Sequence, residues 1–281
     1  MQDTSADLIL KRNANRNFIL NVLDGMAFIF GISLVSRFTV LPFFVARLSS
    51  DRWVQGLLPT LTQAGWVLPA LFMAPLVASR PRRKPLILTM TLGERIPVLL
   101  LGLVLISWPG LPATVLLAIF FLLYGIQAFS GGCAATAWQD FIARIIPERR
   151  WGTFFGLQSG LGAVLGIASA VIAGNVLAVQ PFPQSIGILS LICFAAMVLS
   201  YIFLSLTVEP PQPVEPRQSM RTFLRGLRPL LRNNPAFQRY LLSRSAIALS
   251  LLGHSFITAA ALERFGLSEA EVGLFTAVLL A

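Results

Sequence analysis

The stretch 113-ATVLLAIFFLLYGIQAFSGGCAA-135 decides the fold, because it carries no charged residue over a length that can cross a bilayer as one helix. About 20 helical residues are enough to span the hydrocarbon core of a membrane. Similar apolar stretches precede and follow it, and together they cover residues 18–45, 53–77, 86–106, 113–135, 153–177 and 185–206. The sequence therefore predicts an all-α membrane protein, a polytopic bundle with six spans in its amino-terminal half.

A second half begins after a linker at residues 207–239. A seventh apolar stretch covers residues 240–262, and an eighth begins at residue 272. The nine residues after Val272 are about half of what a span requires, since each helical residue adds about 1.5 Å. We expect the polypeptide to be truncated there, with the missing carboxyl-terminal half present in the full-length protein.

The charges are distributed as in a multi-pass membrane protein. The chain is 56% hydrophobic and only 12% charged, with a net charge of +10. Seventeen of its 22 Lys and Arg residues fall on one side of the predicted spans, and the positive-inside rule assigns that side, with the amino terminus, to the cytoplasm. The basic excess thus reflects topology and excludes nucleic acid as the expected partner. We expect a bacterial-type cytoplasmic (inner) membrane, with the lipid bilayer as partner.

The linker opens with four prolines between residues 210 and 216, which favour an extended chain. Arginines at positions 221, 225, 228 and 232 then form one face of a predicted helix, opposite Leu224, Leu227 and Leu231. Pro229 is expected to bend or interrupt this helix. Such a helix lies on the cytoplasmic membrane surface or acts as a regulatory, lipid-sensing element.

Two loops resemble the major facilitator superfamily. Its signature between spans two and three is Gly, three residues, Asp-Arg, one residue, then Gly-Arg-Arg/Lys, and residues 75–84 here read PLVASRPRRK. The basic positions match, whereas Pro75, Ser79 and Arg82 replace the two Gly and the Asp. Asp140, followed by Pro147 and the run RRWG at residues 149–152, resembles the family's loop between spans four and five. Six spans, a basic linker and a repeated start of a second half complete the resemblance.

The resemblance implies a secondary active transporter that moves a small solute by alternating access, as a permease or an efflux protein. It also implies a conformational network at the cytoplasmic face, formed by Ser79, Arg80, Arg83, Lys84, Asp140 and Arg150. In that network we expect Arg83 within ion-pair reach of Asp140. Drug/proton antiporters of the superfamily usually carry an Arg in span four where this chain has Gln127, and a Gly-Pro motif in span five that is absent here.

Other functions find less support. The chain has no GxxxxGK[ST] loop for ATP and no nucleophile-base set or metal-ligand cluster, so neither an enzyme, a cofactor nor a metal is expected. The alternative to a transporter is a sensor or a lipid-handling scaffold of similar fold. A carboxylate at membrane depth inside a polar cavity would favour the transporter.

Ionisable groups within spans are candidates for solute binding or coupling, because each costs about 2.5–3.5 kcal/mol at the membrane centre. They are Asp24, Arg37, Glu94, Arg95 and His254. Glu94 and Arg95 point about 100° apart on one helix, so at least one should reach another span. They form either a buried pair that locks spans together or a proton or solute site, which leaves proton coupling open.

Polar side chains extend this candidate set. Tyr124 and Gln127 share a face of span four near mid-membrane and are expected, with Glu94 and Arg95, to point into the bundle rather than at lipid. In span one, residues 17, 21 and 24 form a stripe of Asn, Asn and Asp, which is either an inter-helix hydrogen-bond network or part of a solute pathway. His254 is either a coupling group or an inter-helix hydrogen bonder.

Overall fold

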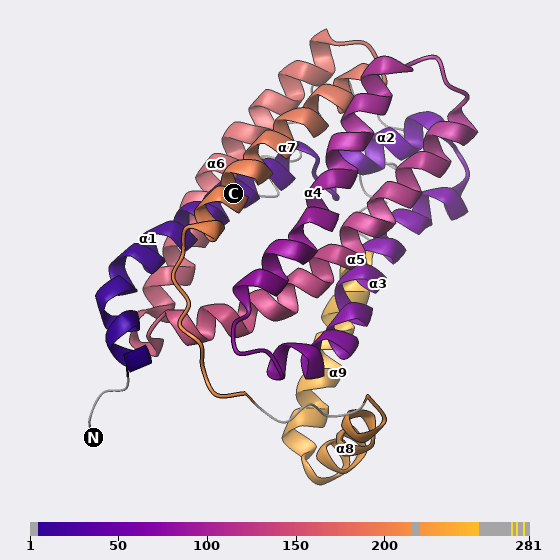
Figure 1. Ribbon diagram of the computed structural model, residues 1–281. Coiled ribbons are helices and arrows are strands. Elements are labelled where there is room, and N and C mark those ends of the chain that lie inside the picture. Colours follow the sequence, from indigo (N-terminus) through magenta and orange to yellow (C-terminus); the bar gives the residue numbers. More distant parts are fainter. Residues whose placement is uncertain (1–4, 215–219, 253–270, 272–273, 275–277, 279–281) are drawn as a thin grey trace.

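A computed structural model describes residues 5–214 and 220–252, together with the isolated positions 271, 274 and 278 (Figure 1). The described residues fold into helices joined by short turns, with no strand among them. The helices are α1 (Ser5–Leu34), α2 (Val40–Leu48), α3 (Arg52–Ala78), α4 (Lys84–Ser107), α5 (Ala113–Ile145), the 3-10 helix η1 (Glu148–Arg150), α6 (Trp151–Val179), α7 (Gln184–Ser205), α8 (Met220–Asn233) and α9 (Pro235–Leu252).

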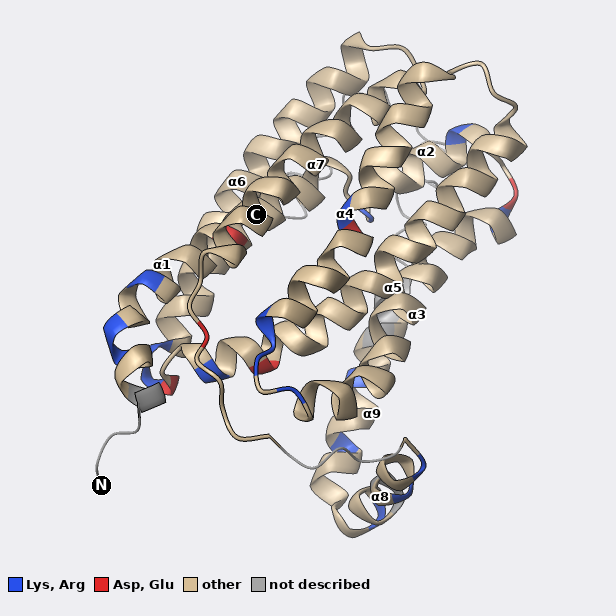
Figure 2. Ribbon diagram, viewed as in Figure 1, with Lys and Arg blue, Asp and Glu red and all other residues tan. Residues whose placement is uncertain are grey.

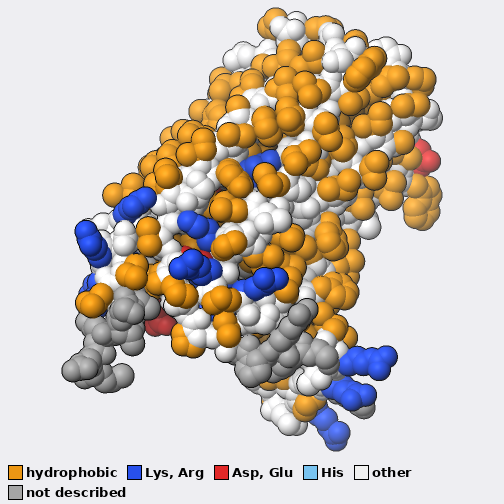
Figure 3. All heavy atoms as spheres, viewed as in Figure 1, with side chains coloured by type: hydrophobic (Ala, Val, Ile, Leu, Met, Phe, Trp, Pro, Cys, Tyr) orange, Lys and Arg blue, Asp and Glu red, His pale blue; other side chains and the backbone are white. Residues whose placement is uncertain are grey.

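Six described helices are long and apolar enough to cross a membrane, namely α1, α3, α4, α5, α6 and α7. The prediction of an all-α polytopic bundle is therefore confirmed. Large apolar side chains such as Leu122 and Val164 point away from the bundle, with 65% and 64% of their surface exposed. Apolar side chains cover much of the face of the bundle seen in Figure 3, as expected for a surface that meets lipid rather than water.

The spans form two groups of three (Figure 1). Helix α1 packs against α6 and α7, α5 packs against α3 and α4, and the contact between α4 and α7 joins the groups. Lipid is as apolar as the core, so close packing rather than the hydrophobic effect holds such helices together. Phe44 and Phe120 pack edge to face at 5.2 Å in one half of the core, while Phe154 packs against Phe18 at 5.8 Å in the other.

Glycines allow a close crossing between α3 and α5. A Cβ atom on Gly132 would lie 2.1 Å from the carbonyl oxygen of Gly65, so only Gly fits there. On α6, a Cβ atom on Gly162 would lie 2.5 Å from Ile29 of α1, whereas Gly156 and Gly160 have open space around them. Small residues thus bring particular pairs of helices together, and Gly156 and Gly160 leave their part of the α6 surface smooth.

The first predicted span, residues 18–45, is wrong as a single helix. Helix α1 ends at Leu34, and the chain turns before α2 begins at Val40. Pro42 favours the break, because inside one continuous helix its ring would crowd the carbonyl group of Phe38, a cost that α3 and α4 bear at their own interior prolines. As the third residue of α2, it instead occupies a position whose N–H group needs no helical partner.

The end of the bundle crossed by residues 207–214 is called here the linker end. Helices α3 and α5 finish there, α4 and α6 begin there, and most Lys and Arg residues of the bundle lie near that end (Figure 2). Helix α5 continues to Ile145, beyond its predicted end at Ala135, and α8 runs through Pro229 without interruption. Of the predicted seventh span, residues 240–252 belong to α9, while residues 253–262 and His254 lie outside the described residues.

Candidate functional site

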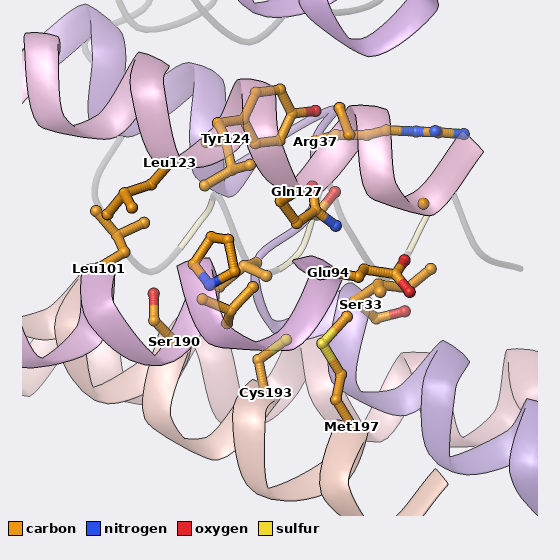
Figure 4. A pocket seen from close by; sticks show the side chains of 18 of the residues that line it. Ser33, Arg37, Glu94, Leu101, Leu123, Tyr124, Gln127, Ser190, Cys193 and Met197 are labelled. Atoms are coloured by element: carbon orange, nitrogen blue, oxygen red, sulfur yellow. The ribbon is translucent and has the colours of Figure 1, made fainter. Parts of the chain in front are cut away.

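Two adjoining cavities lie inside the bundle. The first has a volume of about 340 Å³ and is lined by α1, α3, α4, α5, α7, the start of α2 and the connection between α1 and α2 (Figure 4). The second has a volume of about 250 Å³ and lies between α1, α4, α5 and α7, with Trp66 of α3 and Gln158 of α6 also in its wall. Four residues line both cavities: Phe28, Trp66, Glu94 and Gly131. The two cavities therefore meet at Glu94, the eleventh of the 24 residues of α4.

Three charged side chains form a buried cluster at this depth. Asp24, Glu94 and Arg95 are exposed by only 6%, 5% and 3% of their surface, and all three line the second cavity. The prediction that Glu94 and Arg95 face the interior is thus confirmed. Because charges at this depth have little water to solvate them, each needs a partner within the protein or in a cavity.

Arg95 finds its partners on α7 and on its own helix. Its Nε atom donates to the carbonyl oxygen of Met197 at 2.8 Å, Nη2 donates to Ser200 Oγ at 3.1 Å, and Nη1 donates to the carbonyl oxygen of Thr91 at 3.1 Å. Ser200 in turn donates to Asp24 Oδ1 at 2.6 Å. Arg95 therefore links α4 to α7 and, through Ser200, to α1.

Glu94 is held much less firmly than Arg95. The shortest approach of the two side chains, from Arg95 Nη1 to Glu94 Oε2, is 3.7 Å, which is an ion pair but too long for a hydrogen bond. As predicted from their angle on the helix, the guanidinium group reaches another span. The carboxylate faces the two cavities instead (Figure 4).

The remaining candidates of the spans lie around the first cavity (Figure 4). The Tyr124 hydroxyl is hydrogen-bonded to Thr62 of α3 at 2.6 Å, and its ring stacks on Phe120 at 5.5 Å. Gln127 also faces the cavity, so the predicted inward direction of Tyr124 and Gln127 is confirmed. Arg37 does not lie in a span but in the connection between α1 and α2, where its guanidinium lies 4.9 Å from the centre of the Phe38 ring.

The polar stripe of α1 divides into two parts. Asn17 and Asn21 belong to an inter-helix network: Asn17 Nδ2 donates to the Val208 carbonyl oxygen at 2.8 Å, and Gln158 Nε2 donates to the backbone oxygen of Asn21 at 3.1 Å. Asp24 lies one turn further along and faces the second cavity. The two asparagines therefore fit the interpretation as an inter-helix hydrogen-bond network. Asp24, which faces a cavity, fits the interpretation as part of a solute pathway.

A helical bundle with a mid-depth cavity and a buried charge cluster is shared by many membrane proteins, so sequence comparison decides the family. The model of the Major Facilitator Superfamily matches residues 23–281, nearly the whole chain. The chain belongs to the Major Facilitator Superfamily. It is therefore a membrane transporter of this superfamily. A comparison with curated proteins gave no match.

The superfamily signature loop lies at the linker end, where the predicted ion pair is present. Arg83 Nε donates to Asp140 Oδ2 at 2.5 Å, and Arg144, one turn further along α5, donates to the same oxygen at 2.8 Å. Arg83 is almost fully buried, whereas the Asp140 side chain is 40% exposed. Arg144 Nη1 also donates to Gln212 Oε1 at 2.9 Å and so connects α5 to the segment after α7.

Glu209 completes this network and was not anticipated from the sequence. Its two carboxylate oxygens accept the backbone N–H groups of Arg83 and Lys84 at 2.8 Å each, at the start of α4. A carboxylate in this position satisfies unpaired donors and complements the helix dipole. An acidic residue beside the prolines of the linker was the available signal, but its partners lie more than a hundred residues earlier in the chain.

The other predicted members of the linker-end network have separate contacts. Lys84 Nζ donates to the carbonyl oxygens of Ser205 and Thr207 at 3.0 and 2.7 Å, so it binds the end of α7. Ser79 Oγ donates to the Leu76 carbonyl oxygen at 3.0 Å within its own helix, and Arg80 is exposed. Arg150 donates to Asn15 Oδ1 of α1 at 2.7 Å. Lys84 is joined to Arg83 through Glu209, whereas Ser79, Arg80 and Arg150 share this end of the bundle without belonging to the same set of contacts.

Proposed function

We propose that this member of the Major Facilitator Superfamily moves a small solute across a bacterial-type inner membrane by alternating access. The two cavities that meet at Glu94 carry the proposal, since they offer a buried, charged binding place near the middle of a span. Solute sites of secondary transporters lie near the bilayer midplane, where the site can open to either side in turn. Glu94, Gln127 and Tyr124 would contact the solute, and Arg95 would hold Glu94's helix against α7.

The proposed orientation places the linker end in the cytoplasm. The basic side chains of the loops gather at that end, as the positive-inside rule requires of cytoplasmic loops. In this orientation the Arg83–Asp140 pair ties α4 to α5 at the cytoplasmic face and stabilises the state that is closed there. The first cavity, beside the connection between α1 and α2, then lies nearer the outer face.

The accessibility of one cysteine from each side of the membrane tests this proposal. Trp66 lines both cavities, so Trp66→Cys is introduced into the full-length protein after the two native cysteines, Cys133 and Cys193, are replaced by Ser. Alternating access predicts that a membrane-impermeant maleimide labels this cysteine in right-side-out and in inside-out vesicles. Leu100→Cys, on an exposed apolar face of α4, serves as the control and should remain unlabelled.

Labelling from one side only would overturn alternating access. It would favour the second class of function, a sensor or lipid-handling scaffold with a cavity that is open to one face of the membrane. Because this readout needs no knowledge of the solute, it tests the transport cycle separately from any assignment of substrate.

A further inference from the structure

Among the buried charged side chains that the structure describes, Glu94 differs from the others in its hydrogen bonding. Asp24 accepts from Ser200, Arg83 donates to Asp140, Arg95 makes three hydrogen bonds, and Glu209 accepts two. Glu94 has no hydrogen bond within the described part of the chain, and its one ion pair is the 3.7 Å approach of Arg95. A carboxylate can accept about four hydrogen bonds, so most of this group's capacity is unused.

Arg95 is placed too far from Glu94 to complete it. Three of its five N–H groups donate to Met197, Thr91 and Ser200, and its guanidinium lies 5.3 Å from the centre of the Tyr201 ring. The N–H groups that remain come no closer than the 3.7 Å between Nη1 and Glu94 Oε2, and the planar guanidinium is fixed by its bonds to α7. The open side of Glu94 is therefore the side that faces the cavities, where a donor on a ligand can approach it.

The net charge of the cluster indicates the charge of a ligand that would bind there. Asp24 and Glu94 contribute two negative charges and Arg95 one positive charge, which leaves a buried excess of one negative charge when both carboxylates are ionised. Arg37 also lines the first cavity, but it is exposed, so solvent screens its charge more than those of the buried groups. One added positive charge beside Glu94 balances the cluster, whereas a dication would overcompensate it.

The walls of the first cavity indicate the chemistry of the rest of the ligand. They are mostly apolar, with the rings of Phe28, Trp66 and Phe120 among them. Hydroxyl groups of the wall are already engaged: Ser33 and Ser190 donate to backbone oxygens of their own helices at 2.7 and 2.8 Å. Aromatic rings bind both apolar groups and cations. The cavity thus suits an apolar body of drug-like size that carries few polar atoms.

The backbone also leaves room for a ligand beside the carboxylate. Gly131 of α5 faces Glu94 across the shared wall of the cavities, and a Cβ atom at position 131 would lie 3.1 Å from Glu94 Oε1. Any larger residue would crowd the oxygen atom that a cation needs to approach. Gln127, which also faces the first cavity, can add one amide donor or acceptor to a bound amine.

We propose that the solute is an amphipathic organic monocation, whose protonated amine binds the Glu94 carboxylate while its apolar body lies against Phe28 and Trp66. The inference rests on the proposed function, since it names the substrate class of the same cavity. If Glu94 had only a structural role, a ligand would bind equally well to the protein with a carboxylate at position 94 and to the protein with an amide there.

Equilibrium binding to the purified full-length protein tests the inference, with 2-phenylethylammonium as the probe. The neutral 2-phenylethanol and the anionic 3-phenylpropanoate have the same ring and a similar length. Quenching of tryptophan fluorescence, to which Trp66 contributes, gives Kd for each compound. We expect the ammonium to bind at least tenfold more tightly than the alcohol and the carboxylate not to bind measurably.

Variants of the protein show which residues cause the preference for ammonium. Glu94→Gln should remove the preference for ammonium over alcohol, Glu94→Asp should keep part of it, and Gly131→Ala should weaken ammonium binding severalfold. Glu148→Gln, which removes an exposed carboxylate in η1, is the matched control and should bind as the unaltered protein does. Uptake of radiolabelled 2-phenylethylammonium into proteoliposomes, reduced by Glu94→Gln, should accompany binding.

Equal binding of ammonium and alcohol by the unaltered protein would overturn the inference, even if Glu94→Gln failed to fold. Unchanged ammonium binding by a folded Glu94→Gln protein would also overturn it. Failure of the proposed function looks different: the amine would bind through Glu94, but the cysteine at position 66 would be labelled from one side only. Two-sided labelling without amine selectivity would instead keep the transport cycle and reject this substrate class.

Discussion

The charges at the linker end and those in the middle of the bundle are bonded in different ways. At the linker end, Asp140 accepts from two arginines, and Glu209 accepts two backbone N–H groups at the start of α4. In the middle, Arg95 is equally well bonded but Glu94, its neighbour on α4, is not. Charges bonded to other helices hold those helices together, even where one atom such as Arg83 Nη1 lacks a partner among the described residues, whereas a charge without a hydrogen bond at a cavity is available to a ligand.

The largest effect on stability is expected from Arg95→Met. The substitution removes three hydrogen bonds and deprives Asp24 and Glu94 of the guanidinium charge that lies beside them. Breaking a buried ionic cluster in this way costs about 3–5 kcal/mol. The free energy of unfolding, measured by titration with SDS in mixed micelles, should fall by this amount.

Arg95→Lys is the control for charge alone. An ammonium group cannot reach Met197, Ser200 and Thr91 at once with the spacing of a guanidinium. We therefore expect Arg95→Lys to lie between the unaltered protein and Arg95→Met. Equal stability of all three proteins would show that the bonds of Arg95 to α7 do not hold the two groups of helices together.

A smaller effect is expected from Glu209→Ala at the linker end. The substitution removes the carboxylate that caps α4, and the loss of such a cap costs typically about 1 kcal/mol. Amide hydrogen exchange should accelerate in the first turn of α4 and in residues 207–214, while the middle of α4 should be unaffected. Glu209→Gln retains one acceptor and should show a weaker change; faster exchange throughout α4 would contradict a local capping role.

The sequence predicted the inward direction of Glu94 and Arg95 because lipid cannot solvate a charge, whatever the detailed packing. The break after Leu34 could not be predicted from Pro42 alone, because Pro59, Pro69 and Pro75 lie inside α3 and Pro97 lies inside α4. The hydrogen-bond partners of the buried charges could not be predicted from the sequence either. Ser200 and Glu209 meet their partners only through the packing of helices that are distant in sequence, and no local pattern specifies which side chain faces which.

Arg83→Ala is expected to change the conformational equilibrium as well as the stability. Asp140 keeps its bond to Arg144 and is partly exposed, so loss of the ion pair itself should cost about 1 kcal/mol or less, to which the truncation of the buried Arg83 side chain adds. If the pair favours the state closed at the linker end, the variant should increase cytoplasmic labelling of Trp66→Cys and slow transport. Arg82→Ala, which removes a neighbouring exposed arginine, is the control and should leave the labelling ratio unchanged.

Glu94→Gln should have the smallest effect on stability of the four. The carboxylate has no hydrogen bond to lose among the described residues, and its ion pair with Arg95 is long at 3.7 Å. Neutralising it also removes the excess negative charge beside Asp24, which offsets the lost attraction to Arg95. We expect a change in the free energy of unfolding of no more than about 1 kcal/mol in the SDS titration, near the centre of the distribution for single substitutions.

The stability of Glu94→Gln therefore shows whether Glu94 has the structural role of the linker-end charges or binds a ligand. A loss comparable to that of Arg95→Met would show that Glu94 serves the bundle as Arg95 does, and that the weak contact across 3.7 Å is a structural ion pair. Near-unchanged unfolding together with loss of amine selectivity would assign Glu94 to the ligand. Both outcomes follow from one physical distinction. A buried charge that is hydrogen-bonded within the protein stabilises the fold. A buried charge without hydrogen bonds destabilises the protein without ligand, and a bound cation removes that cost.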